Sequence, residues 1–367
     1  MNKIKAIGSA LVIMLSVTAC TEKEGIGEDL SFLNTTGSSK VDKIFDISND
    51  NSGNVKITPT GEGVSSFTVN FGHGTGAGAS AVVTPGSSTT HAYPEGTYTV
   101  SVVAKDIAGK ETTSTYPLTV TYRAPENVVI TTNSDMAVSA TAAYAKSFLV
   151  YYGDVPNEVG TPMAVGQTLP GHVYPAGGAT PYTLRVVALS GGAATTAATK
   201  PLFGFPIDFE AAGVDFFFGT FGNVNFSKVA NPAAGGMNTS ATVGRYQKPG
   251  NAESWSGTYS PLNIPINFAY GRKIKVLVYN PDPANIGKML NVELEGAVAG
   301  TGATNNGVGI LKAPITKSNE WEELVFDFTS IQQIPATARF NQLVLRFNES
   351  ERGKGEVIYL DHFTQTN

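Results

Sequence analysis

The chain has 367 residues, more than one compact core usually holds, so its length predicts two or three domains. Its formal net charge of −5 and pI near 5.5 leave no basic stripe for a polyanion, which argues against a nucleic-acid partner. Charged residues make up only 15%, and 40 glycines accompany many Thr, Val, Ala and Ser residues. Such a composition favours extended chain and tight turns, and it predicts an all-β protein.

Residues 1–19 are typical of a secretory signal peptide. A short basic region precedes an apolar stretch at residues 6–15, which is too short to span a bilayer stably. The only cysteine, Cys20, follows Val17-Thr18-Ala19, and this segment resembles the lipobox of bacterial lipoproteins. The resemblance implies that Cys20 is diacylated and becomes the mature N-terminus, whereas the alternative is a spare thiol in a discarded peptide.

The residues after the cysteine suggest where the protein is sent. Thr21-Glu22-Lys23-Glu24 resembles the export signals of Bacteroidetes-type surface lipoproteins, which implies the outer membrane and the cell surface, with a lipid anchor at Cys20. Residues 20–40 are polar, contain several Gly and Ser, and lack a strand or helix period. They are therefore predicted to form a flexible tether.

An internal repeat relates residues 41–124 to residues 125–203. With a shift of 81 positions, Phe67-Thr68-Val69-Asn70-Phe71-Gly72 aligns with Phe148-Leu149-Val150-Tyr151-Tyr152-Gly153, and His91-Ala92-Tyr93-Pro94 aligns with His172-Val173-Tyr174-Pro175. After about three inserted residues, residues 96–104 correspond to residues 181–188. An internal duplication into two sandwiches of short strands explains this pattern.

The first copy resembles the polycystic-kidney-disease (PKD) repeat, an immunoglobulin-like sandwich that usually serves as a spacer. The motif Val69-Asn70-Phe71-Gly72-His73-Gly74-Thr75, followed by His91-Ala92-Tyr93-Pro94, carries the resemblance, although the family has aspartate where His73 stands. The second copy keeps Gly153-Asp154 but loses the following glycine, so its assignment depends mostly on the repeat. His91 and His172 recur at equivalent turns, which favours a structural role over a metal or acid–base role.

Residues 204–367 differ in composition from the two repeats, with more Phe, Asn and Lys and both tryptophans, and they are predicted to form one larger sandwich. Residues 206–363 resemble the jelly-roll carbohydrate-binding modules of secreted β-glucanases and of glycan-capture lipoproteins. Five groups of residues carry the resemblance: Ile207-Asp208-Phe209-Glu210, the run from Asn231-Pro232 through Gly236-Met237-Asn238 to Gly244-Arg245-Tyr246, Trp255-Ser256-Gly257, Asn319-Glu320-Trp321-Glu322-Glu323-Leu324 with Phe326-Asp327-Phe328, and Ile358-Tyr359-Leu360-Asp361.

The resemblance also implies a structural calcium ion. In such modules the first and last strands lie side by side, and a carboxylate from each commonly holds the ion. Glu210 and Asp361 match those places, and Asp208 or the loop 236–238 could complete an oxygen shell. The alternative is that these carboxylates are ordinary surface groups.

Exposed aromatic rings are the expected glycan contacts, because sugars stack their C–H faces on flat rings. Trp255 stands in a polar, turn-like context and is the first candidate, followed by Tyr246, Tyr259 and Tyr270. The alternative for Trp255 is a packing role at the sandwich edge. Trp321 opens an apolar-alternating strand and is predicted to be structural. The aromatic run at residues 216–222 is too dense for one strand face, so at least one of its rings should be exposed or cover an edge.

Catalysis is not expected. Glycosidases need two carboxylates across a cleft, and the Glu-x-Asp-x-x-Glu strand of laminarinase-type β-glucanases is absent from the sequence. Glu293 and Glu295, and likewise Glu320, Glu322 and Glu323, are most simply solvated strand residues. The sequence also lacks a nucleophile elbow, a phosphate loop and a Cys/His cluster.

These observations predict a non-catalytic surface lipoprotein in which two PKD-like domains carry a distal glycan-binding module. The resemblance suggests a β-glucan, such as laminarin or a mixed-linkage glucan, captured for a polysaccharide-utilisation system. An outer-membrane glycan transporter and a surface glycoside hydrolase are the expected neighbours. The rival hypothesis is a structural or adhesive surface protein that binds protein partners.

Overall fold

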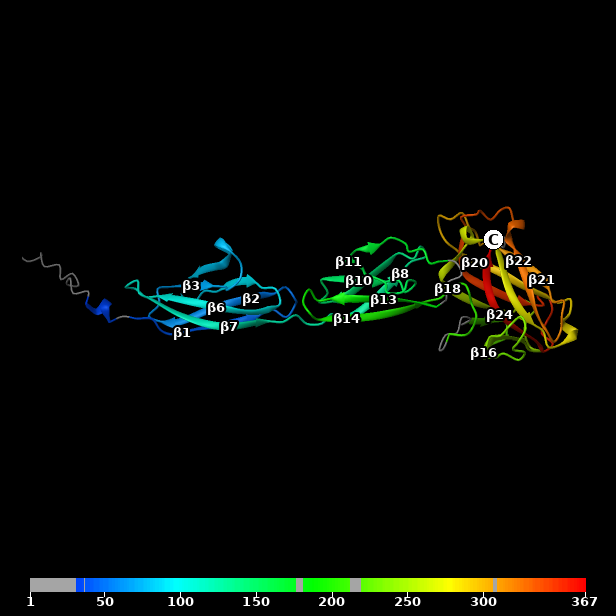
Figure 1. Ribbon diagram of the computed structural model, residues 1–367, viewed down its shortest axis with the longest axis horizontal. Helices are drawn as coiled ribbons and strands as arrows, with labels where there is room; N and C mark the ends of the chain where they lie inside the picture. Colours follow the sequence, from blue (N-terminus) through cyan, green and yellow to red (C-terminus); the bar gives the residue numbers. More distant parts are fainter. Residues whose placement is uncertain (1–30, 36, 176–180, 212–218, 306–308) are drawn as a thin grey trace, which may run out of the picture. The chain divides into compact units, whose positions relative to one another are not determined.

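The computed structural model describes residues 31–35, 37–175, 181–211, 219–305 and 309–367. The predicted signal peptide and Cys20 lie outside these residues. Over the described ranges every regular element is a β-strand or a short 3-10 helix, which confirms the all-β fold class (Figure 1). The chain divides into two compact units, residues 1–122 and residues 123–367.

The first unit contains a sandwich of two antiparallel sheets. One sheet has the order β1-β2-β5 and the other the order β4-β3-β6-β7. Alternate residues of β6 are buried, as expected for a strand with one face on a core. A 3-10 helix at Ser31–Asn34 and the start of the first strand at Ser39 both fall within the predicted tether. The strands are β1 (Ser39–Ile47), β2 (Asn54–Glu62), β3 (Ser66–Asn70), β4 (Ser80–Val83), β5 (Thr89–Ala92), β6 (Gly96–Lys105) and β7 (Glu111–Val120).

The second sandwich repeats this topology. Its sheets have the orders β12-β9-β8 and β11-β10-β13-β14, which match the first sandwich strand for strand. Phe67 pairs with Ala104 in the first copy, and Phe148 pairs with Ala188 in the second. The two repeated segments of the sequence therefore share both strand order and pairing. The strands are β8 (Glu126–Thr132), β9 (Val138–Ala143), β10 (Ser147–Tyr151), β11 (Thr161–Ala164), β12 (Thr168–Leu169), β13 (Tyr182–Leu189) and β14 (Thr195–Leu202).

The C-terminal module packs two five-stranded antiparallel sheets face to face, with the orders β15-β18-β23-β20-β21 and β16-β17-β24-β19-β22. Phenylalanine side chains such as Phe209, Phe340 and Phe363 fill the core between them. The strands are β15 (Gly219–Phe221), β16 (Asn225–Ala230), β17 (Thr242–Lys248), β18 (Gly257–Asn267), β19 (Lys273–Tyr279), β20 (Met289–Ala297), β21 (Ile310–Pro314), β22 (Trp321–Asp327), β23 (Arg339–Phe347) and β24 (Glu356–Thr366).

The two ends of the module lie side by side, as the resemblance to jelly-roll modules implies. Ile207 and Phe363 form an antiparallel bridge, in which each N–H donates to the other carbonyl at 3.0 and 2.9 Å.

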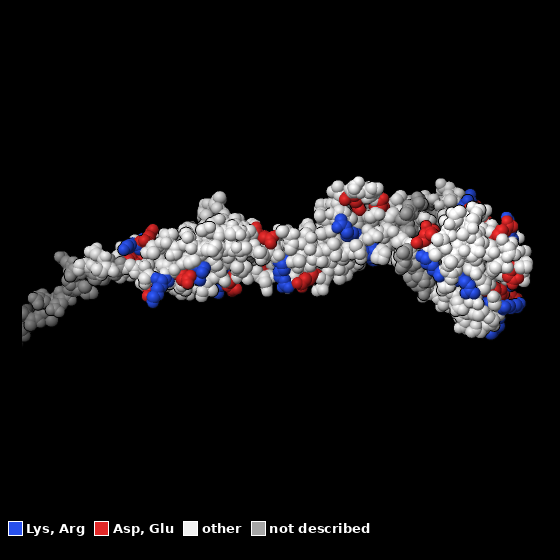
Figure 2. All heavy atoms as spheres, turned by 60° about the horizontal axis from the view of Figure 1, so that its bottom comes forward, with Lys and Arg blue, Asp and Glu red and all other residues white. Residues whose placement is uncertain are grey.

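Over the described ranges, no helix is both long enough and apolar enough to cross a membrane. Acidic and basic side chains are interspersed on the face that Figure 2 shows.

Candidate functional site

The outer face of the β15-β18-β23-β20-β21 sheet gathers aromatic and polar side chains, and we call this face the platform. Successive side chains of a strand point to opposite faces of the sheet. On β20 the side chains of Leu290, Val292 and Leu294 point into the core. Asn291 and Glu293, which alternate with them, therefore belong to the platform.

Aromatic rings lie over glycines at one edge of the platform. Gly219 pairs with Tyr259 across β15 and β18, and Phe221 pairs with Gly257. A Cβ atom on Gly219 would lie 1.9 Å from the Tyr259 ring, and one on Gly257 would lie 2.6 Å from Cζ of Phe221. Each ring thus occupies the space that a side chain on the opposite residue would fill. The two rings lie against the sheet surface.

Trp255 extends this aromatic strip. Trp255 is 53% exposed, and its indole lies 5° from parallel to the Phe221 ring, with centroids 6.1 Å apart. The guanidinium of Arg346 lies 5.1 Å from the Phe221 centroid, and Arg346 Nη1 donates to the Trp255 carbonyl at 2.6 Å. A cation close to an aromatic ring and a charged hydrogen bond both stabilise the loop. Trp255 is therefore an exposed ring on an anchored backbone.

Polar side chains line the platform beside the aromatic strip. Arg346 Nε lies 2.8 Å from Glu293 Oε1, and Gln342 Nε2 donates to Glu295 Oε2 at 2.6 Å. Asn291 Nδ2 donates to a Glu349 oxygen at 2.8 Å, whereas Asn291 Oδ1 is buried without a hydrogen-bond partner among the described residues.

Glu349 joins the platform from the turn that follows β23. Its carboxylate also accepts from Lys312 Nζ at 2.6 Å. This contact with Lys312 lowers the pKa of Glu349, and the hydrogen bond from Asn291 acts in the same direction against the effect of burial. Asn291 and Glu293 are buried beneath this surface. The platform consequently presents the half-buried groups above them, which are the carboxylates of Glu295 and Glu349, the Gln342 amide and the Arg346 guanidinium.

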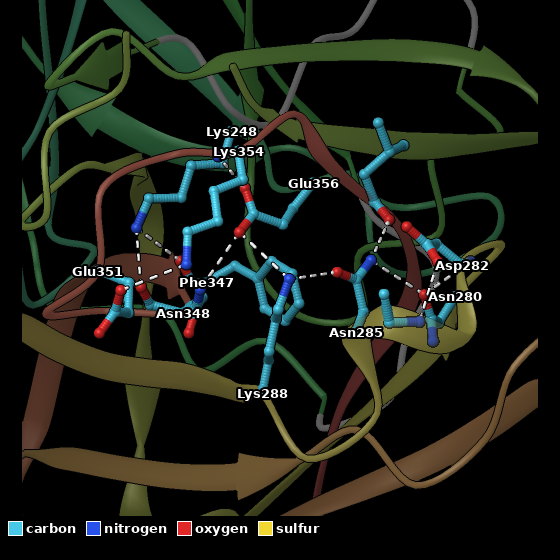
Figure 3. A network of polar contacts seen from close by, with 12 residues as sticks. Lys248, Asn280, Asp282, Asn285, Lys288, Phe347, Asn348, Glu351, Lys354 and Glu356 are labelled. Carbon is cyan, nitrogen blue, oxygen red and sulfur yellow. Dashed lines mark hydrogen bonds and ion pairs between the residues drawn. The ribbon is translucent and has the colours of Figure 1, made fainter. Parts of the chain in front are cut away.

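A buried network at the end of the module holds this turn (Figure 3). Lys248 is fully buried and donates to the carbonyls of Phe347 and Asn348 at 3.1 and 2.8 Å. Glu356 accepts from Asn348 Nδ2 at 3.2 Å. Burial lowers the pKa of Lys248, while the Glu356 carboxylate opposes that shift. Because these contacts join both ends of the turn between β23 and β24, they position Glu349.

The structure separates the four predicted glycan-contact residues. Trp255 and Tyr259 lie on the aromatic strip and are 53% and 36% exposed. Tyr246 is fully buried and its ring packs edge-on against Phe347, so the prediction that Tyr246 stacks on a sugar is wrong. Burial raises the pKa of the Tyr246 hydroxyl. Tyr270 is half-buried and lies beyond the far end of β18, at the opposite end of that strand from Trp255.

The predicted calcium residues lie near the bridge between the module ends. Asp361 is fully buried and accepts from Asn238 Nδ2 at 2.8 Å and from the His362 N–H at 2.8 Å. Glu210 is exposed and accepts from the Thr242 N–H at 2.8 Å. Asp208 accepts from the Glu210 N–H at 3.1 Å. No group of three or more His, Cys, Asp or Glu residues in the described ranges is placed to hold a metal.

The other aromatic predictions have different outcomes. Trp321 is 6% exposed, packs with Val243 and Leu277, and donates from Nε1 to the Ala233 carbonyl at 3.0 Å. Its structural role is confirmed, but it lies in a small separate cluster and not in the main core. Residues 216–218 of the aromatic run fall outside the described residues.

Sequence reasoning did not select Phe221, Arg346 or Gln342 as site residues. A signal for Phe221 was present, because Gly219-Thr220-Phe221 and Gly257-Thr258-Tyr259 share the pattern Gly-Thr-aromatic. In an antiparallel pair, that pattern can place each ring opposite a glycine. No comparable local signal identifies Arg346, whose partner Glu293 lies 53 residues away.

Comparisons with known proteins give distant structural likenesses. SGBP-B from a complex xyloglucan utilization locus in Bacteroides uniformis has 12% identity and a TM-score of 0.30, covering 89% of this chain and 98% of that one. The family 11 carbohydrate-binding module of a cellulosomal cellulase of Clostridium thermocellum has 14% identity and a TM-score of 0.29, covering 44% and 92%. An adhesin domain of Lys-gingipain from Porphyromonas gingivalis has 14% identity and a TM-score of 0.29, covering 44% and 96%. Neither a family model nor a curated protein matches the chain.

Proposed function

We propose that the protein is a non-catalytic glycan-binding protein whose ligand lies on the platform of the C-terminal module. The observation that carries the proposal is the strip of Trp255, Phe221 and Tyr259 beside oriented polar groups. Aromatic faces suit the C–H faces of sugars, while carboxylate, amide and guanidinium groups suit their hydroxyls. The ligand class that fits both parts of the platform is a neutral polysaccharide.

A β-glucan such as laminarin or a mixed-linkage glucan is the ligand we favour. This choice comes from the resemblance of the module motifs to β-glucanase modules. The platform supports a neutral, hydroxyl-rich ligand, and a β-glucan is one such ligand. Neutral hydroxyl-rich chains complement a surface on which acidic and basic groups are already paired, as Glu293 is with Arg346.

The platform carboxylates favour binding over catalysis. A glycosidase needs an acid free to give its proton at the scissile bond and a second carboxylate across a cleft. The Glu293 side chain is 3% exposed and paired with Arg346, and Glu295 accepts a hydrogen bond from Gln342. Both glutamates serve to orient their partners in this proposal.

The anchoring model extends this function to the cell surface. Lipidation at Cys20 would hold the module on the outer membrane and raise the local concentration of weak glycan contacts. In this setting the protein would pass a captured chain to an outer-membrane transporter and a neighbouring surface glycoside hydrolase of a polysaccharide-utilisation system.

Replacing Trp255 tests the proposal directly. The protein lacking residues 1–20 is run in native gels containing laminarin, mixed-linkage glucan, xyloglucan, xylan, mannan, starch or alginate. We expect retardation by at least one glucan, and we expect Trp255→Ala to weaken binding about tenfold or more, because it removes the exposed stacking surface.

The matched control is Tyr359→Ala, which removes a ring that contacts Tyr279 on the other sheet. Retardation of this control should equal that of the unmodified chain. If no glycan retards the protein, the proposal fails and the adhesive alternative, with a protein partner, takes its place.

We also propose that the module holds a structural calcium ion at Glu210 and Asp361. The donors there are oxygens, which suit a hard cation, and Asp208 could contribute. Calcium supplies a positive charge that would stabilise the buried Asp361 carboxylate. Chelation with EGTA should lower the midpoint of thermal unfolding followed by tryptophan fluorescence, and added calcium should restore it. An unchanged midpoint would contradict the proposal.

A further inference from the structure

Strand β18 contains an irregularity at the end of the module where the second sandwich joins it. Both sandwiches belong to one compact unit, residues 123–367. β18 pairs with β23 on either side of an interval that runs from Pro261 to Ile266. Over that interval β18 advances five residues while β23 advances two, so the extra residues of β18 leave the ladder. Such a bulge re-aims side chains out of a sheet. We call residues 262–265 the β18 bulge.

The β18 bulge pairs with the end of the second sandwich. The Ile264 N–H donates to the Phe203 carbonyl at 2.8 Å, and the Phe203 N–H donates to Asn263 Oδ1 at 3.0 Å. Phe203 directly follows β14, the last strand of the second sandwich. The approach is close, because a Cβ atom on Gly204 would lie 2.8 Å from Cβ of Ile264. A glycine at position 204 therefore lets the connection lie against the bulge.

The two cores exchange side chains across this contact. Ile264 packs against the hydrophobic cluster of the second sandwich, whereas Leu262 and Ile266 belong to the main cluster of the module. Phe203 and Phe205 of the connection in turn pack against the module cluster. Tandem domains are expected to move relative to one another unless apolar side chains hold them together. The exchange therefore indicates a fixed junction.

An ion pair ties the two sandwiches together beside the β18 bulge. Nη2 of Arg339, the first residue of β23, lies 2.8 Å from Asp135 Oδ1 in the turn between β8 and β9. The register places Arg339 opposite Asn267, the last residue of β18. Both charged side chains are partly exposed, so the ion pair contributes little stability by itself. It does hold the β8–β9 turn at the same end of β18 as the bulge.

We propose that the second sandwich is a docked part of the C-terminal module and unfolds together with it, whereas a PKD-like spacer would unfold on its own. β18 begins at the aromatic strip, where it carries Tyr259, and it ends at this junction. The second sandwich therefore holds the strand that presents part of the platform. This coupling does not depend on which ligand the platform binds, and its failure would leave the proposed function intact.

Urea unfolding of the chain without residues 1–20 tests the coupling. Tryptophan fluorescence follows the module, which holds both tryptophans. Phe148 is buried in the core of the second sandwich, so Phe148→Ala leaves a cavity there. We expect this variant to lower the midpoint of the fluorescence transition by roughly 1 M urea. Phe67→Ala is the matched control, because Phe67 has the equivalent pairing in the first sandwich, and it should leave the midpoint unchanged.

A second comparison tests whether the junction transmits the effect. Ile264→Asn removes the apolar side chain that the module places against the second sandwich. In this background Phe148→Ala should no longer lower the fluorescence midpoint. Because both chains of this comparison carry Ile264→Asn, the effect of that substitution on the module itself cancels.

Three results would overturn the inference. The first is an unchanged fluorescence midpoint in Phe148→Ala, and the second is an equal fall in Phe67→Ala. The third is an equal fall caused by Phe148→Ala with and without Ile264→Asn. A Phe148→Ala chain whose second sandwich is already unfolded without urea remains informative, because a module that still unfolds at the unmodified midpoint would refute the coupling.

Discussion

Equivalent residues of the two sandwiches show how one substitution changes a local environment. His91 stacks on Phe71 with ring centroids 4.2 Å apart, and His172 stacks on Tyr152 at 3.8 Å. The stacking is thus shared, which agrees with the structural role predicted for both histidines. The partner differs, because His91 contacts His73 whereas His172 contacts a carboxylate. Burial, and then the charge of His73, lower the pKa of His91 below its ordinary value of 6.5.

A pH dependence of the first sandwich follows from this shift. A lowered pKa means that the unfolded chain takes up the proton more readily, so stability is lost as the pH falls below about 6.5. His73→Asp should remove this loss, because a carboxylate favours the protonated imidazole. Calorimetric midpoints at pH 7.5 and 5.5 measure the effect, with His73→Asn as the uncharged control. Equal acid sensitivity in all three proteins would contradict the argument.

Sequence reasoning at the residue scale failed for Tyr246 for a definable reason. Along β17, Tyr246 and Lys248 are buried, whereas Arg245 and Gln247 are less so. Polar residues thus stand on both faces, and the usual alternation of apolar and polar residues is absent. Lys248 enters the interior because the carbonyls of the turn after β23 accept its hydrogen bonds. That turn comes about 100 residues later in the chain.

At the scale of elements, the β15–β18 pair creates the aromatic strip. Each strand contributes one ring and one glycine, and the antiparallel register places each ring opposite the glycine of its neighbour. Rings that cover glycines on an adjacent strand also strengthen a weak edge of a sheet. The strip is therefore both a cover for the edge strand and a surface on which a sugar can stack.

A glycine substitution in this pair should disturb the strip. A Cβ on Gly219 would overlap the Tyr259 ring, so Gly219→Ala should push the ring away and reduce glycan binding several-fold. The cost to stability should stay within about 1–3 kcal/mol, because Tyr259 is partly exposed and can move. Gly250→Ala is the control, since its Cβ meets nothing within 4 Å. Gel retardation and urea unfolding measure the two effects, and equal binding by both variants would refute the role of the strip.

At the scale of the whole molecule, the three sandwiches have separate hydrophobic cores. One main hydrophobic cluster fills each sandwich, the C-terminal module has a further small cluster around Trp321, and both tryptophans belong to this module. Tryptophan fluorescence therefore reports on the module alone. The anchor is proposed at the opposite end of the sequence, on the single cysteine. Because that cysteine has no partner for a disulfide, its replacement tests attachment without removing a cross-link.

Cys20→Ser should release the protein from the membrane. In a Bacteroidetes host, the unmodified chain should incorporate radiolabelled palmitate and fractionate with the outer membrane. The variant should lose the label and enter the soluble fraction, because no acyl chains hold it. Protease shaving of whole cells would show whether the unmodified chain faces outwards. Labelled, membrane-bound Cys20→Ser protein would contradict the anchoring model.

The sequence by itself determined the all-β class and the internal repeat, because strand alternation, repeated motifs and turn residues are local signals. The meeting of the module ends was implied by the resemblance to jelly-roll modules. The sequence also identified Trp255 and Tyr259, whose polar surroundings indicated exposure. Only the tertiary structure decided that Phe221 and Arg346 belong to the platform and that Tyr246 is buried. These outcomes depend on strand register and on contacts between residues far apart in the chain, which local patterns do not encode.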